Sequence, residues 1–173
     1  NDNKLFFHEI AASKNLKAGQ PSKLSGKMAM ASLEAATQFC QSDGADALVT
    51  GPLDKFIVSL SHPHFEGHTE YLQKKVKSRS VTMILSGKSL TVALCTTHIP
   101  LRRVASQLTS KRIAETIGAL HSFLKIHHER PQIAVLALNP HASDRGLFGN
   151  EEAKIILPAI EKATFMYLSI LWL

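Results

Sequence analysis

Three histidines lie where an imidazole could take part in catalysis or metal binding. His68 follows a glycine, His98 follows a strand-like run of small and β-branched residues, and His141 follows an Asn-Pro pair. Imidazole titrates near neutral pH and is a frequent ligand of divalent metals. The three are too far apart in the sequence to form a local metal-binding motif, so ordinary hydrogen bonding within a loop stays open as the alternative for each.

Other common chemical motifs are missing from the sequence. It contains neither G-x-G-x-x-G nor G-x-x-x-x-G-K-[ST] for a nucleotide, and no G-x-S-x-G for a nucleophilic serine. Gly146 and Gly149 form a lone G-x-x-G, which more often turns the chain than binds phosphate. Cys40 and Cys95 are too few for a disulfide framework or a cysteine zinc site, and both are predicted to pack in the interior.

The composition is that of a globular domain, or of part of one. The chain has 173 residues, 45% of them hydrophobic and 20% charged. No apolar run approaches the roughly 20 residues of a membrane span, and no signal peptide opens the chain, so we expect a soluble cytoplasmic protein. The net charge of +6 fits an anionic small molecule such as a phosphate ester. The basic residues lack interleaved aromatics, so a nucleic-acid partner is not expected.

Helical and strand-like periodicities alternate along the first half of the chain. A helix over residues 26–41 is predicted with Ser25 as its cap, followed by a buried strand over 45–50 that ends in a Gly-Pro turn. The remaining predicted elements are one or two helical turns at 55–60, a loop at 61–67 and a helix at 69–77.

The second half continues this alternation. Two strands, 81–85 and 90–96, are predicted to form a hairpin, and Ile113, Ile117, Leu120 and Leu124 mark the apolar face of a helix. A strand at 132–138 and a helix capped by Asn150, kinked or shortened at Pro158, complete the pattern. The order predicts an α/β protein with helices on both sides of a mixed sheet. The polar loops near Thr50, Thr97 and Leu138 would then meet at one sheet edge.

Four stretches together resemble the motifs of one enzyme family. They are V-T-G-P-x-x-K at 49–55, F-x-G-H-T-E at 65–70, V-A-L-x-T-T-H-x-P-L at 92–101, and L-N-P-H-A at 138–142 with F-G-x-E-E at 148–152. They occur in the family's order, within a resemblance that runs from about Leu24 to Glu161. On these motifs the chain resembles the 4-hydroxythreonine-4-phosphate dehydrogenases of pyridoxine biosynthesis.

The resemblance implies roles for individual residues. It implies that His68 and Thr69 contact the substrate, and that His98 and His141 bind a divalent metal such as zinc, magnesium or cobalt. It implies NAD or NADP as cofactor, oxidation of a small phosphorylated substrate with decarboxylation, and a homodimer with its site between subunits. The implied fold is similar to that of isocitrate and isopropylmalate dehydrogenases, incomplete here at both ends.

The chain also departs from the family pattern. A Y-H-D-Q-G-like motif with a third metal histidine is absent, and Ser143-Asp144-Arg145 replaces a glycine-rich G-E-G-like run. Residues 1–162 are therefore expected to form a partial catalytic domain, and 163–173 an apolar tail outside the pattern. Catalytic and cofactor-binding residues are not identified. Two alternatives stay open: an inactive fragment that binds at most a metal or phosphate, and a dehydrogenase of four-carbon sugar-acid phosphates.

Overall fold

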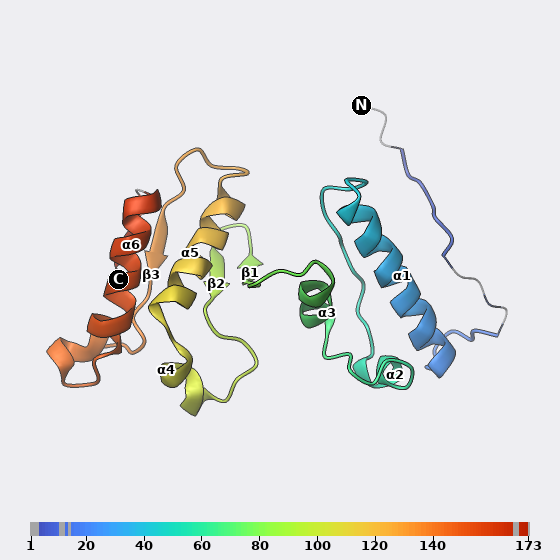
Figure 1. Cartoon of the computed structure of the whole chain (residues 1–173), viewed down its shortest axis with the longest axis horizontal. Coiled ribbons are helices and arrows are strands. Elements are labelled where there is room, and N and C mark those ends of the chain that lie inside the picture. The colour runs from blue at the N-terminus through green and yellow to red at the C-terminus, as the bar shows by residue number, and fades with distance from the viewer. Residues whose placement is uncertain (1–3, 11–12, 14, 168–169, 173) are drawn as a thin grey trace. The chain divides into compact units, whose positions relative to one another are not determined.

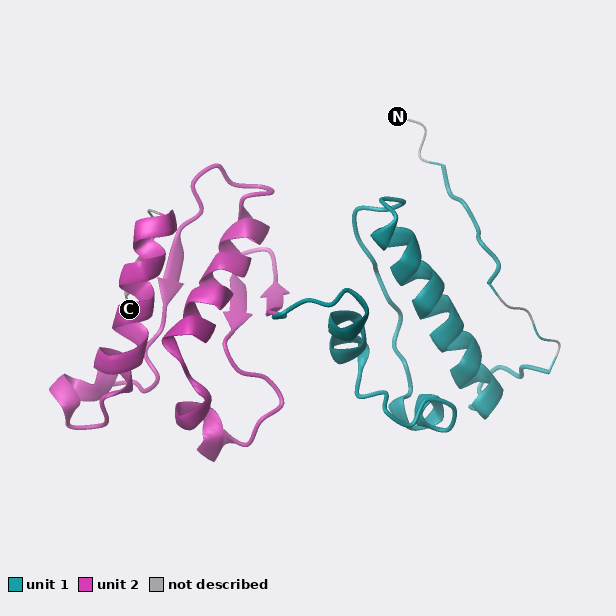
Figure 2. Cartoon of the chain, viewed as in Figure 1, with its two compact units in different colours: residues 1–81 teal, residues 82–173 magenta. Residues whose placement is uncertain are grey.

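The computed structural model describes residues 4–10, 13, 15–167 and 170–172 of the chain. These fall into two compact units, residues 1–81 and 82–173, which Figure 2 shows in different colours. In the described part of the chain no helix has the length and apolar character needed to cross a membrane.

The described residues of unit 1 form three helices, α1 (Lys23–Gln41), α2 (Lys55–Ser59) and α3 (His68–Lys75) (Figure 1). Helix α1 begins earlier than predicted, because Ser22 and not Ser25 is its cap. The Ser22 hydroxyl accepts a hydrogen bond from the Ser25 amide at 3.1 Å, and the Ser25 hydroxyl accepts one from the Ser22 amide at 3.0 Å. This reciprocal capping box satisfies two amides that would otherwise lack partners, and so fixes the first turn.

The core of unit 1 is small. Met30, Leu33 and Val58 are its buried residues, where α1 packs on α2. At Gly26 a Cβ would lie only 2.6 Å from the carbonyl oxygen of Ile57, so the glycine permits the close approach of the two helices. The predicted helical turns at 55–60 and the loop at 61–67 are confirmed.

The predicted buried strand at 45–50 is wrong for this structure. The segment is extended but forms no β-ladder with any described residue, and the Val49 side chain is 94% exposed. Its β-branched residues favour extended backbone, yet a strand also requires a neighbour to pair its amides and carbonyls. No such neighbour exists among the described residues.

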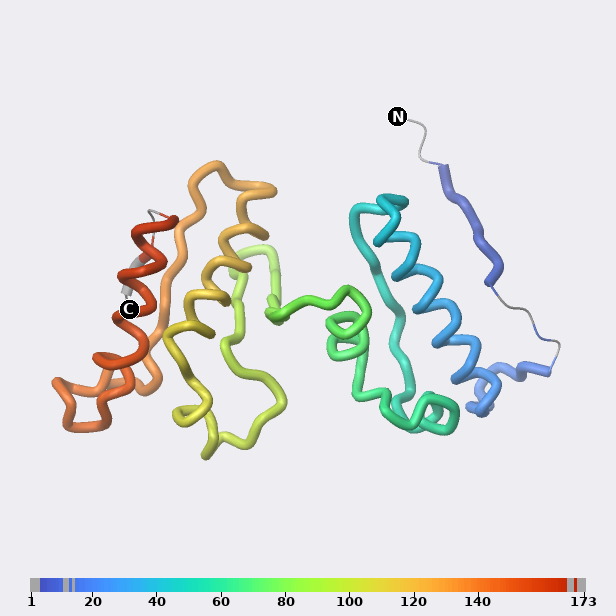
Figure 3. Tube along the Cα trace, viewed as in Figure 1, coloured from blue at the N-terminus to red at the C-terminus, as the bar shows by residue number. Residues whose placement is uncertain are grey.

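Unit 2 begins with the predicted hairpin. Strands β1 (Met83–Ser86) and β2 (Thr91–Leu94) pair antiparallel, with Met83 opposite Leu94. A 3₁₀ turn, η1 (Leu101–Arg103), and the short α4 (Val104–Gln107) lead into α5 (Ser110–Leu124), a path that Figure 3 traces in green to yellow. The predicted apolar helix face is confirmed, because Ile113, Ile117 and Leu120 are buried.

The second pair of strands in unit 2 is parallel. Strand β3 (Ile133–Val135) is shorter than predicted and pairs with β4 (Ile170–Trp172). The described residues thus form two separate two-stranded sheets, and the predicted single mixed sheet is not seen. A strand joins a sheet only through main-chain hydrogen bonds, and none link these two ladders. The chain is helix-rich and broadly α/β.

A π-helical turn, η3 (Glu152–Ile156), leads into α6 (Leu157–Tyr167). The Leu157 amide donates to the carbonyl of Glu152, five residues back. The following Pro158 has no amide hydrogen, and its ring would crowd the carbonyl four residues earlier in a regular α-helix. The wider turn therefore takes the place of the predicted kink.

The main core of unit 2 lies where α5 packs on α6 and strand β3. Its buried members are Ile113, Ile117, Leu120, Ile133, Ile156, Ala159, Ile160 and Ala163. The boundary of the expected apolar tail at residue 163 lies within α6, and Ala163 is only 1% exposed. Residues 168, 169 and 173 of that tail lie outside the described residues.

Candidate substrate and metal-binding loops

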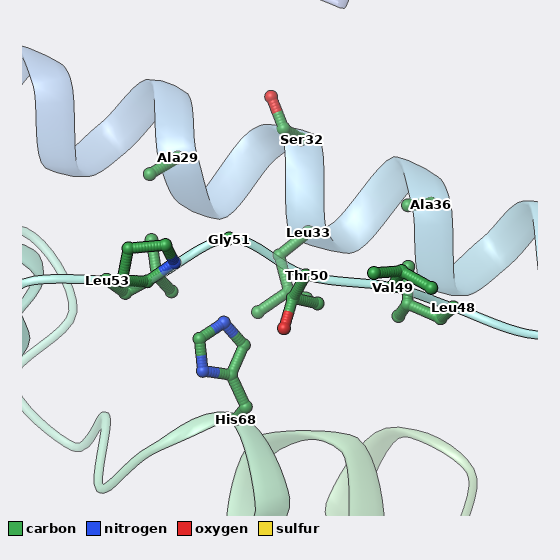
Figure 4. Close-up of a pocket in the computed structure, with 11 residues that line it drawn as sticks. Ala29, Ser32, Leu33, Ala36, Leu48, Val49, Thr50, Gly51, Leu53 and His68 are labelled. Atoms are coloured by element: carbon green, nitrogen blue, oxygen red, sulfur yellow. The ribbon is translucent and has the colours of Figure 1, made fainter.

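His68 lies at the edge of a pocket of about 280 Å³ in unit 1. It is the first residue of α3, and its imidazole points toward the extended segment that carries Thr50 and Gly51 (Figure 4). The Phe65 ring meets the imidazole edge-on, with centroids 6.3 Å apart. The remaining wall comes from small and apolar residues of α1 and the 48–53 segment: Ala29, Ser32, Leu33, Ala36, Leu48, Val49, Pro52 and Leu53.

Polar residues lie next to His68 in the first turn of α3. Thr69 is half-buried in that turn, and Gly67 is its N-terminal cap residue. A Cβ on Gly67 would lie 2.9 Å from a Glu70 carboxylate oxygen and 3.5 Å from the Lys55 ammonium nitrogen. The motif glycine thus lets an acid and a base lie close over the backbone beside His68. The negative charge of Glu70 and the positive charge of Lys55 therefore offset each other at this point.

His98 lies in the loop that follows β2 and is exposed to solvent. Its φ is +57°, an uncommon backbone angle for a residue with a Cβ. The preceding Cys95 is half-buried against the core of unit 2. Burial raises the pKa of the Cys95 thiol above its ordinary value, an effect that a hydrogen bond with Thr116 and the charge of Arg112 oppose. Cys95 thus packs against the core, as the sequence predicted, and its raised pKa disfavours the thiolate.

His141 lies in a loop whose backbone is wound left-handed. The four residues after it have positive φ: Ala142, Ser143, Asp144 and Arg145, at 46°, 64°, 42° and 55°. Such angles cost non-glycine residues free energy, and this is the stretch where the resemblance placed glycines. The Phe148 ring packs on the imidazole at 5.2 Å, with an angle of 30° between the planes. The His141 side chain itself remains exposed.

A buried carboxylate supports the base of this loop. Glu152 is 2% exposed, and its Oε1 accepts hydrogen bonds from the Leu138 amide and from the Asn139 side-chain nitrogen, both at 3.2 Å. The Asn139 oxygen in turn accepts from the His141 amide at 2.9 Å and the Ser143 amide at 3.4 Å. Glu152 Oε2 is buried and has no hydrogen-bond partner among the described residues.

The four predicted site residues fall into two pairs. His68 and Thr69 belong to unit 1, whereas His98 and His141 belong to unit 2. Strands β2 and β3 point the same way in Figure 1, so the loops with His98 and His141 leave from the same end of unit 2. The described residues contain no group of three His, Cys, Asp or Glu side chains placed to hold a metal ion. Whether the four residues act together stays a prediction.

Sequence reasoning missed the residues that support the loop. Asn139 and Glu152 appeared only as letters of two motifs, and Glu152 was assigned to a helix start. A hydrophobicity pattern could not have predicted that Glu152 is buried, because glutamate side chains rarely are. The sequence offers one hint of this contact. The L-N-P-H-A and F-G-x-E-E motifs are separated by only five residues, and a short loop can bring Asn139 and Glu152 together.

Comparison with known proteins gives consistent matches along the chain. The family model described as "Pyridoxal phosphate biosynthetic protein PdxA" matches residues 2–169. A 4-hydroxythreonine-4-phosphate dehydrogenase of Vibrio parahaemolyticus is 38% identical, over 91% of this chain and 48% of its own length. A protein of Salmonella typhi described as a putative D-threonate 4-phosphate dehydrogenase is 36% identical, over 89% of this chain and 47% of its own.

A solved structure agrees with these relatives. The crystal structure of 4-hydroxythreonine-4-phosphate dehydrogenase from Klebsiella pneumoniae superposes with a TM-score of 0.84 at 32% identity, covering 94% of this chain and 50% of that one. The chain thus spans about half the length of the relatives that it matches. Because the family model covers nearly all of its residues, the chain belongs to the family of the pyridoxal phosphate biosynthetic protein PdxA.

Proposed function

We propose that this chain contributes to a dehydrogenase that oxidises 4-hydroxythreonine 4-phosphate, with decarboxylation, in pyridoxal phosphate biosynthesis. The observation that carries the proposal is the family match over residues 2–169, which includes all four sequence motifs. In this proposal residues 1–162 are part of the catalytic domain, and a homodimer completes the site between subunits. The whole enzyme has the isocitrate and isopropylmalate dehydrogenase kind of fold.

His68 and Thr69 bind the substrate in this proposal. His68 lines the pocket in unit 1, Thr69 follows it in the first turn of α3, and the Lys55 ammonium group lies near Gly67. The positive charge of Lys55 would attract a phosphate or carboxylate of the substrate, and the nearby Glu70 carboxylate would oppose it. The pocket wall on α1 is apolar, which limits water near the bound molecule.

His98 and His141 bind the divalent metal. Their donor chemistry fits zinc or cobalt, but two imidazoles are fewer than the three protein ligands that catalytic zinc usually has. The described residues therefore offer part of a ligand set. When bound, the metal would supply Lewis-acid polarisation of the substrate hydroxyl. NAD or NADP would accept the hydride, and no residue of this chain is assigned to either cofactor.

A metal titration tests the assignment to His98 and His141. Cobalt(II) added to the 173-residue chain should give a saturable d–d absorption band, and the double variant His98→Ala, His141→Ala should lose it. His128→Ala is the matched control, because His128 lies in the turn after α5 and is predicted to bind no metal. An unchanged band in the double variant would refute the metal assignment, and loss in the control would refute its specificity.

The substrate is tested separately, since the Salmonella typhi relative favours a second candidate, D-threonate 4-phosphate. Both phosphorylated acids should be titrated against the chain, and then assayed with NAD and with NADP. We expect 4-hydroxythreonine 4-phosphate to bind more tightly, and His68→Ala to weaken it about tenfold or more. Tighter binding of D-threonate 4-phosphate would favour the second substrate. Binding without turnover would favour the alternative of an inactive binding module.

A further inference from the structure

We propose that Asn139 and Glu152 are positioning residues that hold His141 in its place for metal binding. The inference rests on the proposed metal-binding role of His141. It concerns a chain of hydrogen bonds from the buried Glu152 carboxylate, through the Asn139 side chain, to the backbone at His141.

The first link fixes which way the Asn139 amide faces. Its nitrogen donates to Glu152 Oε1 at 3.2 Å, while its oxygen accepts from the His141 and Ser143 amides. If the amide were reversed, its oxygen would face the carboxylate and its nitrogen would face two amide hydrogens. Only one orientation satisfies all three neighbours, and the carboxylate selects it.

The second link fixes the backbone that carries the imidazole. An asparagine oxygen that accepts the amide two residues ahead forms an Asx turn. The Asn139 carbonyl also accepts the Ala142 amide at 3.1 Å, and the His141 carbonyl accepts the Asp144 amide at 2.8 Å. These bonds hold a backbone of four successive positive φ values, which would otherwise relax toward right-handed conformations.

The third link acts on the ring itself. Phe148 packs on the His141 imidazole and is tied to the same loop, because its amide donates to the Ser143 carbonyl at 3.0 Å. Backbone and ring are thus both constrained by residues between 139 and 152. Groups that orient a metal ligand in this way commonly change metal affinity by 10–100-fold when they are removed.

Two variants should break the network, and one should spare it. Asn139→Ala removes the bridging amide, and Glu152→Leu removes the acceptor at similar volume. Glu152→Gln keeps an oxygen at the Oε1 position, so it can still accept both hydrogen bonds. Glu151→Gln is the matched control, because the same change is made one residue away, where the side chain makes no hydrogen bond to a described residue of the loop.

Amide hydrogen exchange measured by NMR gives the first readout, and it needs no metal. The His141 and Ser143 amides should exchange at least tenfold faster in Asn139→Ala and Glu152→Leu, while the amides of α5 keep their protection. Exchange within twofold of the parent is expected for Glu152→Gln and Glu151→Gln. The Asn139→Ala variant should fold, because the Asn139 side chain is only half-buried. Unchanged exchange of the His141 and Ser143 amides in this variant would overturn the proposal.

Cobalt(II) affinity gives the second readout. The disrupting variants should bind 10–100-fold more weakly than the parent, and Glu152→Gln should restore affinity to within about threefold. Faster exchange with unchanged affinity would overturn the positioning role and leave only a structural one. A parent chain that binds no cobalt would refute the proposed metal role of His141, and with it the positioning role for a metal ligand, while the exchange result would still show whether Asn139 and Glu152 order the loop.

Discussion

The two units support their candidate residues with apolar cores of different size. Among the described residues, the main core cluster of unit 2 has eight buried apolar members and that of unit 1 has three. In unit 2 the loops with His98 and His141 follow strands that pack on this larger core. In unit 1 the His68 pocket is lined by the 19-residue helix α1, the first residue of α3 and a segment that pairs with no described strand. The difference shows that candidate binding residues can rest on a large or a small apolar core, and in unit 2 the hydrogen bonds of Asn139 and Glu152 add to the packing.

The largest expected loss of stability comes from truncating a buried side chain in the core of each unit. Ile117→Ala in unit 2 and Leu33→Ala in unit 1 remove side chains that are 4% and 6% exposed, so each should lower the free energy of unfolding by about 2–5 kcal/mol. Exchange mass spectrometry should show loss of protection in α5 and α6 for the first variant and in α1 for the second.

Phe165→Ala serves as the control for both core variants. Phe165 is 91% exposed on α6, so its loss should change the free energy of unfolding by no more than about 0.5 kcal/mol. If either core variant released both units to the same extent, the units would unfold together and the comparison between them would not hold.

Substitution of one helix glycine in each unit is expected to have a smaller effect on the free energy of unfolding. Gly26→Ala places a Cβ against the Ile57 backbone and should destabilise unit 1 by about 1–3 kcal/mol. Gly118→Ala meets the Tyr167 hydroxyl at 2.8 Å, which can move, and alanine gains about 1 kcal/mol of helix propensity. Thermal unfolding should therefore show a loss for the first variant and no loss for the second. Equal losses would mean that α1 and α2 are not held by their close approach.

Left-handed residues offer a third comparison. Ser143→Gly should raise the free energy of unfolding of unit 2 by about 1 kcal/mol, because glycine adopts a φ of 64° without strain. Asp43→Gly in unit 1, at a φ of 57°, should gain less, since aspartate tolerates this region better. Urea unfolding measures both. A loss of stability in Ser143→Gly would show that the loop does not adopt this backbone.

The smallest effect concerns the ion pair between Glu34 of α1 and Lys75 of α3. The hydrogen bond and charge of Lys75 lower the pKa of Glu34 below its ordinary value of 4.5. The pair therefore stabilises unit 1 at pH values above 4.5, and this contribution is lost as the pH falls through the lowered pKa. Glu34→Gln should reduce the pH dependence of the stability of α1 between pH 5 and 3, as measured by amide hydrogen exchange. The same measurement should show no change in α5. A parallel pH response in parent and variant would contradict this.

Local patterns predicted much of this fold. The apolar spacing of Ile113, Ile117 and Leu120 identified α5, and the strand-like runs at 81–85 and 90–96 identified the β1–β2 hairpin. The 45–50 segment was mistaken because strand formation depends on a partner that local sequence does not show. For the same reason the pairing of β3 with β4 could not be predicted from local sequence. The cap of α1 was misplaced because both Ser22 and Ser25 fit the preference for a capping serine.

The candidate site was predictable only in part. Motif resemblance selected the four residues, and the structure has His98 and His141 in loops but His68 and Thr69 in the first turn of α3. The glycine-rich run that the resemblance places at Ser143-Asp144-Arg145 is the one hint in the sequence of the left-handed backbone after His141. The hydrogen bonds of Glu152 depend on the packing of a π-helical turn against a loop 13 to 14 residues away in sequence. No residue pattern specifies such a contact in advance.

The π-helical turn has a consequence for changes of chain length. Glu152 and Ile156, at its two ends, are both buried, one toward the His141 loop and the other in the apolar core. A π turn holds one residue more than an α turn, so it has the geometry of a single-residue insertion absorbed within a helix. Deleting one residue between 153 and 155 could thus restore an ordinary helix while both ends keep facing inward. Pro158 would then disfavour the regular α-helical turn that replaces the π turn. The extra residue and the proline are therefore expected to be lost or kept together.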